Sequence, residues 1–338
     1  MIEEKVVVGK GGEFPLDGLL TLPKEAKDTE EKDASPIPAL PAVVLVQGSG
    51  ASDKDSTVYA IKPFKDLAEG LAERGIAAVR YDKRTYTHGE KMAKNPALTV
   101  REETIEDAIL AAQILKDDPR IDPDHIYIVG LSMGAMLAPR IDAEGGDFAG
   151  LVLLAGSTRR LEEIMKSQIE EAMDKLNPLF RWMARLQSKR MLAKFDTMYD
   201  LSDEEAQKTP IVGKRANAYY FIEAGRKPAS DYLKKLEKPV LVMYGDKDFH
   251  GSVEGHFKPY KELLSHNDKA SFKLYPGLNH VFMPSVYNDI TKARKEYSVK
   301  QHVVPEVIDD IADWIKGDKK PKATDEKKQE AKDEKKED

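Results

Sequence analysis

The run Gly130-Leu131-Ser132-Met133-Gly134 decides the fold of this chain. An apolar stretch at residues 126–129 precedes it, and the residues that follow it suit a helix. Glycines on both sides of a serine permit a sharp turn from a buried strand into a helix, with the serine exposed on the turn. The pattern is weak alone, because a glycine-rich loop produces it by chance. Its place between a strand and a helix makes Ser132 a candidate nucleophile.

A serine hydroxyl is a weak nucleophile that needs a neighbouring base and donors for the oxyanion that forms. The first donor expected here is the backbone N–H of Met133, because a helix N-terminus directs its amides at developing negative charge. The second is expected from the small-residue loop 48–51, where the N–H of Ser49 is favoured over that of Gly50. The plainer alternative is an ordinary strand-to-helix turn in which Ser132 is only an N-cap.

Apolar runs alternate with amphipathic segments along most of the chain. The predicted strands are residues 2–8, 16–22, 41–46, 76–80, 125–129, 148–155, 239–244 and 271–275. The predicted helices are residues 63–74, 134–143, 254–264 and 305–316, and one that opens with a capping box of Thr99 and Glu102. Pro139 is expected to shorten or kink its helix. This alternation indicates an α/β fold with a mainly parallel central sheet flanked by helices.

Residues 158–236 interrupt the alternation. They predict several helices and no buried strand, and they hold five of the eleven methionines and several aromatic residues. We interpret them as a helical cap, or lid, inserted into an α/β core of residues 1–157 and 237–317. Residues 24–40 are charged and proline-rich, which predicts a surface loop. Residues 318–338 hold eight lysines, eight acids and nothing to bury, which predicts a disordered tail.

The composition argues against several classes of protein. A formal net charge of −6 without a basic stripe argues against a nucleic-acid partner. The longest apolar runs are far shorter than the roughly 20 residues that span a bilayer, so no membrane partner is expected. The absence of cysteine rules out disulfides, a thiolate nucleophile and zinc–thiolate sites. The first residues, Met-Ile-Glu-Glu-Lys, do not resemble a secretory signal, and we expect a cytoplasmic protein.

The candidate base is His280, one of seven histidines. It follows the predicted strand 271–275, in Pro276-Gly277-Leu278-Asn279-His280, which places it at the same sheet edge as Ser132. The other histidines in the last third of the chain lie in or beside polar loops and helices. We expect these to be exposed to solvent: His250, His256, His266 and His302.

Two aspartates, Asp246 and Asp248, follow the predicted strand 239–244, and either is able to accept the N–H of an imidazole. An acid between the serine and the histidine fits the chain order expected for this architecture. Asp248 is two residues deeper in the loop, where it can turn back toward His280. The alternative role for Asp246 is that of a turn-forming side chain. The task of the acid is to fix the histidine tautomer and stabilise the imidazolium.

Six motifs together resemble those of the bacterial α/β-hydrolase carboxylesterases. They are Gln47-Gly48-Ser49-Gly50, Lys62-Pro63-Phe64, Arg80-Tyr81-Asp82-Lys83-Arg84, the nucleophile run, Gly245 with Asp248, and Leu278-Asn279-His280. The resemblance covers about residues 14–317 in order. It implies an α/β-hydrolase fold with a helical cap, Asp248 as the acid, hydrolysis of short-chain acyl esters, and no metal or organic cofactor. It also implies structural roles for Asp82 and Arg84.

The chain departs from the common pattern at Gln47, where many hydrolases have histidine before the glycine. The backbone donors survive that change. We expect a serine carboxylesterase that hydrolyses short-chain or aryl acyl esters through an acyl-enzyme intermediate, with a small-molecule ester as its partner. The alternatives are another acyl hydrolase (a cinnamoyl or feruloyl esterase, a thioesterase or an acyl-peptide hydrolase) and a non-catalytic binding module. The oligomeric state, a homo-oligomer included, stays open.

Overall fold

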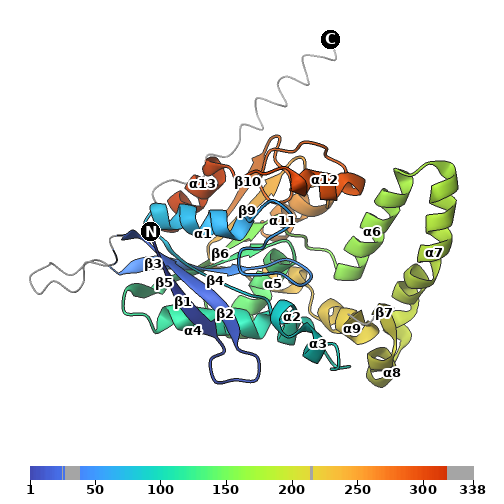
Figure 1. Ribbon diagram of the computed structural model, residues 1–338, viewed down its shortest axis with the longest axis horizontal. Coiled ribbons are helices and arrows are strands. Elements are labelled where there is room, and N and C mark those ends of the chain that lie inside the picture. Colours follow the sequence, from blue (N-terminus) through green and yellow to red (C-terminus); the bar gives the residue numbers. More distant parts are fainter. Residues whose placement is uncertain (25, 27–38, 214–215, 318–338) are drawn as a thin grey trace, which may run out of the picture.

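Eight strands form one mainly parallel sheet in the computed structural model, which describes residues 1–24, 26, 39–213 and 216–317 (Figure 1). The strands are β1 (Ile2–Val8), β2 (Leu16–Leu22), β3 (Leu40–Val46), β4 (Ala77–Tyr81), β5 (Ile121–Leu131), β6 (Gly150–Leu154), β9 (Val240–Gly245) and β10 (Ala270–Tyr275). Their order is β1-β2-β4-β3-β5-β6-β9-β10. β2 pairs antiparallel with β1 and β4, and the other neighbours are parallel. The predicted α/β class is therefore confirmed.

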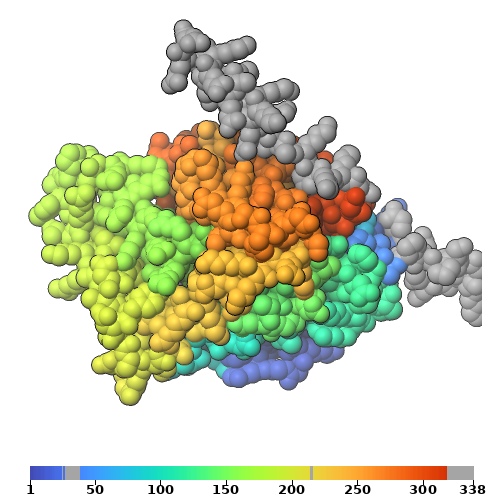
Figure 2. Space-filling view, turned by 180° about the vertical axis from the view of Figure 1, so that it is seen from behind, coloured from blue at the N-terminus to red at the C-terminus, as the bar shows by residue number. Residues whose placement is uncertain are grey.

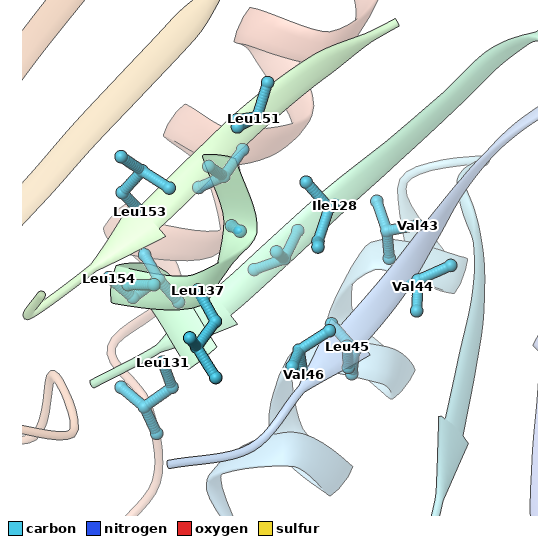
Figure 3. Close-up of a cluster of buried hydrophobic side chains, with 14 of the residues drawn as sticks. Val43, Val44, Leu45, Val46, Ile128, Leu131, Leu137, Leu151, Leu153 and Leu154 are labelled. Atoms are coloured by element: carbon cyan, nitrogen blue, oxygen red, sulfur yellow. The ribbon is translucent and has the colours of Figure 1, made fainter. Parts of the chain in front are cut away.

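The middle of the sheet is apolar on both faces. Every residue of β4, β6 and β9 is buried, as are residues 42–46 of β3. Valine, leucine and isoleucine suit these strands because helices cover the sheet on both sides. Figure 3 shows side chains of β3, β5 and β6 packed with Leu137 of α5 (Met133–Ile141). The edge strand β1 instead alternates half-buried and exposed residues.

Helices cover the two faces of the sheet (Figure 1). α1 (Pro63–Glu73) and α13 (Pro305–Lys316) lie together on one face, and α4 (Glu106–Lys116) and α5 lie on the other. α1 and α13 begin with proline at the first turn, and α13 ends at Gly317 in the left-handed conformation, as is typical of helix boundaries. The shorter helices are α2 (Arg84–Thr87), α3 (Gly89–Met92), α11 (Lys258–Leu263), η6 (Ile290–Lys292) and α12 (Ala293–Ser298).

Three helices are extended by a π-helical turn that the 3.6-residue pattern does not predict. η2 (Arg101–Ile105) leads into α4, η3 (Asp142–Gly146) follows α5, and η5 (Val253–Phe257) leads into α11. Half of the predicted capping box is present, since the N–H and Oγ1 of Thr99 donate to Glu102 Oε2 at 2.9 and 2.5 Å. The Thr99 hydroxyl accepts the N–H of Arg101 at 3.1 Å and not that of Glu102, and the helix begins after Val100. The predicted bounds of β1, β2 and α13 agree with the structure.

The chain between β6 and β9 forms helices and one small hairpin. Its elements are α6 (Leu161–Asp174), α7 (Pro178–Thr197), η4 (Met198–Asp200), α8 (Asp203–Lys208), β7 (Pro210–Val212), β8 (Ala216–Asn217), α9 (Ala218–Arg226) and α10 (Ala229–Leu233). The antiparallel pair β7–β8 corrects the prediction of no buried strand, because Ile211 is buried within it. Arg140 of α5 holds Glu223 of α9 through two hydrogen bonds of 3.2 and 2.6 Å, which ties these elements to the core.

Two predicted segments fall outside the described residues: the tail 318–338 entirely, and most of the surface loop 24–40. In the part of the chain that is described, no helix has the length and apolar character needed to cross a membrane.

Candidate active site

Ser132 occupies a strained turn between β5 and α5. Its backbone has φ 56° and ψ −115°, which is rare for a residue with a side chain. Its N–H donates to the carbonyl of Leu154 on β6 at 2.8 Å, which helps to hold this conformation. Positive φ at a non-glycine residue concentrates at functional sites, and a nucleophile on a strand-to-helix turn is a known example.

The two glycines of the run are required by close backbone approach. A Cβ on Gly134 would lie 2.1 Å from the carbonyl oxygen of Val46, and one on Gly130 would lie 2.4 Å from the backbone of Gly134. No real Cβ tolerates such distances, so a larger residue would push α5 away from β3 and β5. Glycine is thus required at positions 130 and 134 because the backbone packs so closely at this turn.

Asp248 and His280 form a direct hydrogen bond. Asp248 Oδ2 lies 2.7 Å from His280 Nδ1, and Asp248 Oδ1 accepts the backbone N–H of His250 at 2.7 Å. Burial alone would raise the pKa of Asp248, but the neighbouring His280 and His250 lower it. An ionised carboxylate only accepts hydrogen bonds, so the proton lies on Nδ1 and Nε2 is left able to accept one.

Asp246 has a different contact. Its Oδ1 accepts the backbone N–H of Gly277 at 2.6 Å, which fits the turn-forming role. Of the two predicted acids, Asp248 is therefore the one that meets the imidazole.

The three predicted side chains share one edge of the sheet. Ser132 follows β5, Asp248 follows β9 and His280 follows β10, and the carboxyl ends of parallel strands lie together. Among the described residues, Ser132 makes no hydrogen bond to His280. Such contacts are often long before a substrate is bound.

Two other histidines correct the sequence prediction. His256 is buried, and burial lowers its pKa to about 4. His250 is half-buried, and burial followed by the proximity of His280 lowers its pKa to about 3. The rings of His250 and His280 are 4.5 Å apart, and His250 Nε2 lies 3.2 Å from the hydroxyl of Tyr297. His266 and His302 are exposed, as predicted.

The two predicted oxyanion donors lie beside the nucleophile. Met133 directly follows Ser132 at the start of α5, and a Cβ on Gly48 would be 3.2 Å from Ser132 Cβ. Within the described ranges, the N–H groups of Met133 and Ser49 donate to no protein acceptor. Both are thus free to bind an oxyanion.

The other motif residues have structural contacts. The amide of Gln47 donates to the carbonyl of Tyr81. Asp82 Oδ1 accepts the N–H of Lys54 at 2.8 Å, and both Nε and Nη2 of Arg84 donate to Asp107. These contacts agree with the structural roles that the resemblance implies for Asp82 and Arg84.

No group of three or more metal-binding side chains occurs in the described part of the chain.

Comparison with known proteins identifies the family of this chain. A family model described as serine aminopeptidase, S33, matches residues 59–284. The chain belongs to this family. Esterase EstD of Thermotoga maritima is 34% identical over 318 residues, which are 93% of this chain and 67% of that protein. The chain is a serine hydrolase, and its predicted class of carboxylic ester hydrolase is supported by the family and by this relative.

Solved structures of proteins with low sequence identity to this chain share its fold. An esterase of Pyrococcus furiosus, Pf2001, has a TM-score of 0.54 at 15% identity, covering 94% of this chain and 91% of that one. Est1E of Butyrivibrio proteoclasticus has a TM-score of 0.53 at 16% identity, covering 87% and 96%. These structures confirm the predicted α/β-hydrolase fold.

Proposed function

We propose that this family member hydrolyses carboxylic esters through Ser132, His280 and Asp248. Ser132 Oγ attacks the ester carbonyl carbon while His280 Nε2 takes its proton. The N–H groups of Met133 and Ser49 hold the oxyanion, and the alcohol leaves with the proton from His280. Water, activated by the same imidazole, then releases the acid from the acyl-enzyme.

The observation that carries this proposal is the hydrogen bond between Asp248 and His280, at the sheet edge where Ser132 adopts its strained turn. A strand-to-helix turn with Ser132 as a simple N-cap does not account for a buried aspartate aligned on a histidine at the same edge. Nor does a non-catalytic binding module require the free N–H groups of Met133 and Ser49.

We propose that residues 158–236 act as the cap. Gln168 of α6 donates to the carbonyl of His250 at 2.9 Å, and the hydroxyl of Tyr220 on α9 donates to Glu103 at 2.5 Å. The insertion therefore contacts the loop of the proposed acid and the core near the proposed oxyanion hole. Its position supports a role in selecting short-chain or aryl acyl esters.

The family description favours one alternative substrate class, the peptides. A serine aminopeptidase would use the same nucleophile on an amide. Pyrococcus horikoshii acylaminoacyl peptidase shares the fold with a TM-score of 0.55 at 14% identity. The relative named an esterase is far more similar in sequence, and it supports esters as the first choice.

Purified wild type and Ser132→Ala are to be assayed on p-nitrophenyl esters of increasing acyl length, with matched thioesters and acyl-aminoacyl anilides. The proposal expects hydrolysis of the shorter esters by wild type and a loss of at least about 10³-fold in kcat for Ser132→Ala. Faster cleavage of the anilides would favour the peptidase. Ester hydrolysis that survives in Ser132→Ala would rule out the proposed nucleophile.

A further inference from the structure

A buried chain of polar side chains lies under the loop that follows β3. Lys83 Nζ donates to the carbonyl of Gly48 at 2.8 Å and pairs with Glu103 Oε1 at 2.7 Å. The side chain of Lys83 is 2% exposed and that of Glu103 is 8% exposed. The hydroxyl of Tyr220 donates to Glu103 Oε2 at 2.5 Å and lies 3.7 Å from Met133 Sδ. These polar side chains thus connect α9 to both sides of the proposed oxyanion hole.

The hydrogen bond from Lys83 to the Gly48 carbonyl determines the direction of the Ser49 N–H. The peptide bond between Gly48 and Ser49 is trans and planar, so its C=O and N–H point to opposite sides. Because Lys83 holds the carbonyl on the buried side, the Ser49 N–H is directed away from Lys83. The same peptide lies against the nucleophile, since a Cβ on Gly48 would be 3.7 Å from Ser132 Oγ.

The partners of Lys83 hold it in place. Glu103 neutralises the buried ammonium group, and a buried charge of this kind is stable only when it is paired. Burial and then the Glu103 carboxylate raise the pKa of Tyr220 well above its usual value, so its hydroxyl stays protonated and donates.

We propose that Lys83 is a positioning residue for the oxyanion hole: it orients the Gly48–Ser49 peptide so that the Ser49 N–H faces the reacting carbonyl. Glu103 and Tyr220 hold Lys83 in position, and Tyr220 connects the insertion 158–236 to Glu103. The inference rests on the proposed function and selects Ser49 over Gly50 as the second donor. A plain buried ion pair would contribute to folding only.

The test compares Lys83→Met, Tyr220→Phe and the double variant Lys83→Met/Glu103→Gln with wild type. The double variant removes both charges, so it avoids leaving Glu103 buried and unpaired. Lys238→Met is the matched control, because Lys238 pairs with Asp142 and Asp147 at the opposite edge of the sheet. The readouts are kcat, KM, Tm and the inhibition constant of an alkyl boronic acid, which forms a tetrahedral adduct with the serine.

A donor that acts on the oxyanion contributes about 10²–10³ to kcat, so misorienting it should lower kcat by about 10- to 100-fold. KM should change by less than about threefold, because the interaction is made in the transition state. Boronate affinity should fall by the same factor as kcat, with a smaller loss for Tyr220→Phe.

The inference is wrong if Tyr220→Phe and the double variant keep wild-type kcat, or if kcat and boronate affinity do not fall together. The proposed function fails separately, when Ser132→Ala keeps the wild-type rate.

A second feature is the helical hairpin of α6 and α7, which stands at the edge of the molecule (Figures 1 and 2). Only Phe195 of α7 is buried. Five large apolar side chains in its first half are more than half exposed: Leu179, Phe180, Trp182, Met183 and Leu186. Four of them recur at helical spacing and form one outward stripe. Nothing in the described part of the chain covers it.

The two helices carry opposite charges. α6 holds five carboxylates and one lysine, and α7 holds five cations and one aspartate. Among the described residues, Glu170 of α6 and Lys189 and Arg190 of α7 make no ion pair. An anionic lipid surface fits this hairpin poorly, because the acids of α6 would face its headgroups. A partner with the same mixed charge fits both helices.

We infer that a second copy of the chain covers the stripe, with α7 of each protomer beside α6 of its partner. The five side chains expose on the order of 500 Å². A standard interface buries about 800 Å² per partner, of which somewhat more than half is apolar. The stripe therefore supplies about the apolar area that a twofold dimer needs.

Sedimentation velocity of the full chain at micromolar concentration tests this inference. Wild type should be a dimer, and Trp182→Glu/Leu186→Glu should weaken it at least about 100-fold. Tyr86→Glu, an exposed aromatic on α2, is the control and should leave the dimer intact. Glu170→Lys and Lys189→Glu/Arg190→Glu should each weaken self-association, and mixing the two should restore a heterodimer. A monomeric wild type, or a dimer that Trp182→Glu/Leu186→Glu leaves unchanged, overturns the inference.

Discussion

The side chain of Asp248 is completely buried, its carboxylate meets His280 Nδ1 at 2.7 Å, and the His280 side chain keeps 13% of its surface exposed. The Asp248 carboxylate is thus removed from solvent, whereas the His280 imidazole is partly accessible to solvent. In this arrangement the proton stays on Nδ1, and Nε2 is left without a proton.

Replacing Asp248 by asparagine should lower kcat for esters by about 10³- to 10⁴-fold, because the amide favours the wrong histidine tautomer. The matched control is Asp246→Asn, two residues earlier, whose carboxylate contacts the Gly277 N–H and the Lys247 ammonium group and not His280. It should keep kcat within about threefold. Steady-state assays on one ester give both values, and equal losses in the two variants would contradict the assignment of the acid.

The nucleophile turn should not tolerate a methyl group at Gly134. A Cβ there would meet the Val46 carbonyl oxygen at 2.1 Å, so Gly134→Ala should lower the free energy of unfolding by about 3 kcal/mol or more and abolish activity. Gly89→Ala is the control, because nothing lies within 4 Å of its Cβ position. Urea unfolding measures both. A Gly134→Ala protein as stable and active as wild type would refute the packing described for this turn.

The half-buried His250 should make stability sensitive to acid. Its pKa is about 3 in the folded chain against 6.5 for an ordinary histidine. Between pH 6.5 and 3 the unfolded chain binds a proton that the folded chain does not, so the free energy of unfolding falls as pH falls. Above pH 6.5 neither state binds it, and this dependence disappears.

His250→Gln should therefore flatten the acid side of the stability curve by roughly 1–3 kcal/mol between pH 7 and 4, measured by urea unfolding. The exposed His302 provides the control, and His302→Gln should keep the wild-type slope. A His250→Gln curve parallel to wild type would show that another group sets the acid sensitivity.

Local patterns were sufficient where the deciding residues lie within one segment. The helix at 305–316 has proline at its start, glycine at its end and an apolar stripe between them, so its bounds followed from the sequence. The nucleophile turn and the order of Asp248 and His280 are likewise visible along the chain. Their meeting at one edge follows from the parallel sheet.

Contacts between distant residues were not predictable in this way. His250 lies in a polar loop, and its ring meets the hydroxyl of Tyr297, 47 positions later. Tyr220 meets Glu103 across 117 positions, so no local pattern relates α9 to the oxyanion loop. The π-helical turns also escaped prediction, because each is only five residues long, too short for a change of helical period to show in the apolar pattern.

The central claim is that Ser132 is an activated nucleophile. Incubation of the native protein with a fluorophosphonate probe, followed by peptide mass spectrometry, tests it most directly. We expect stoichiometric labelling at Ser132, no labelling of Ser132→Ala, and labelling slowed by about 10³-fold or more in His280→Ala. An unlabelled wild type, or a label on another serine, would contradict it.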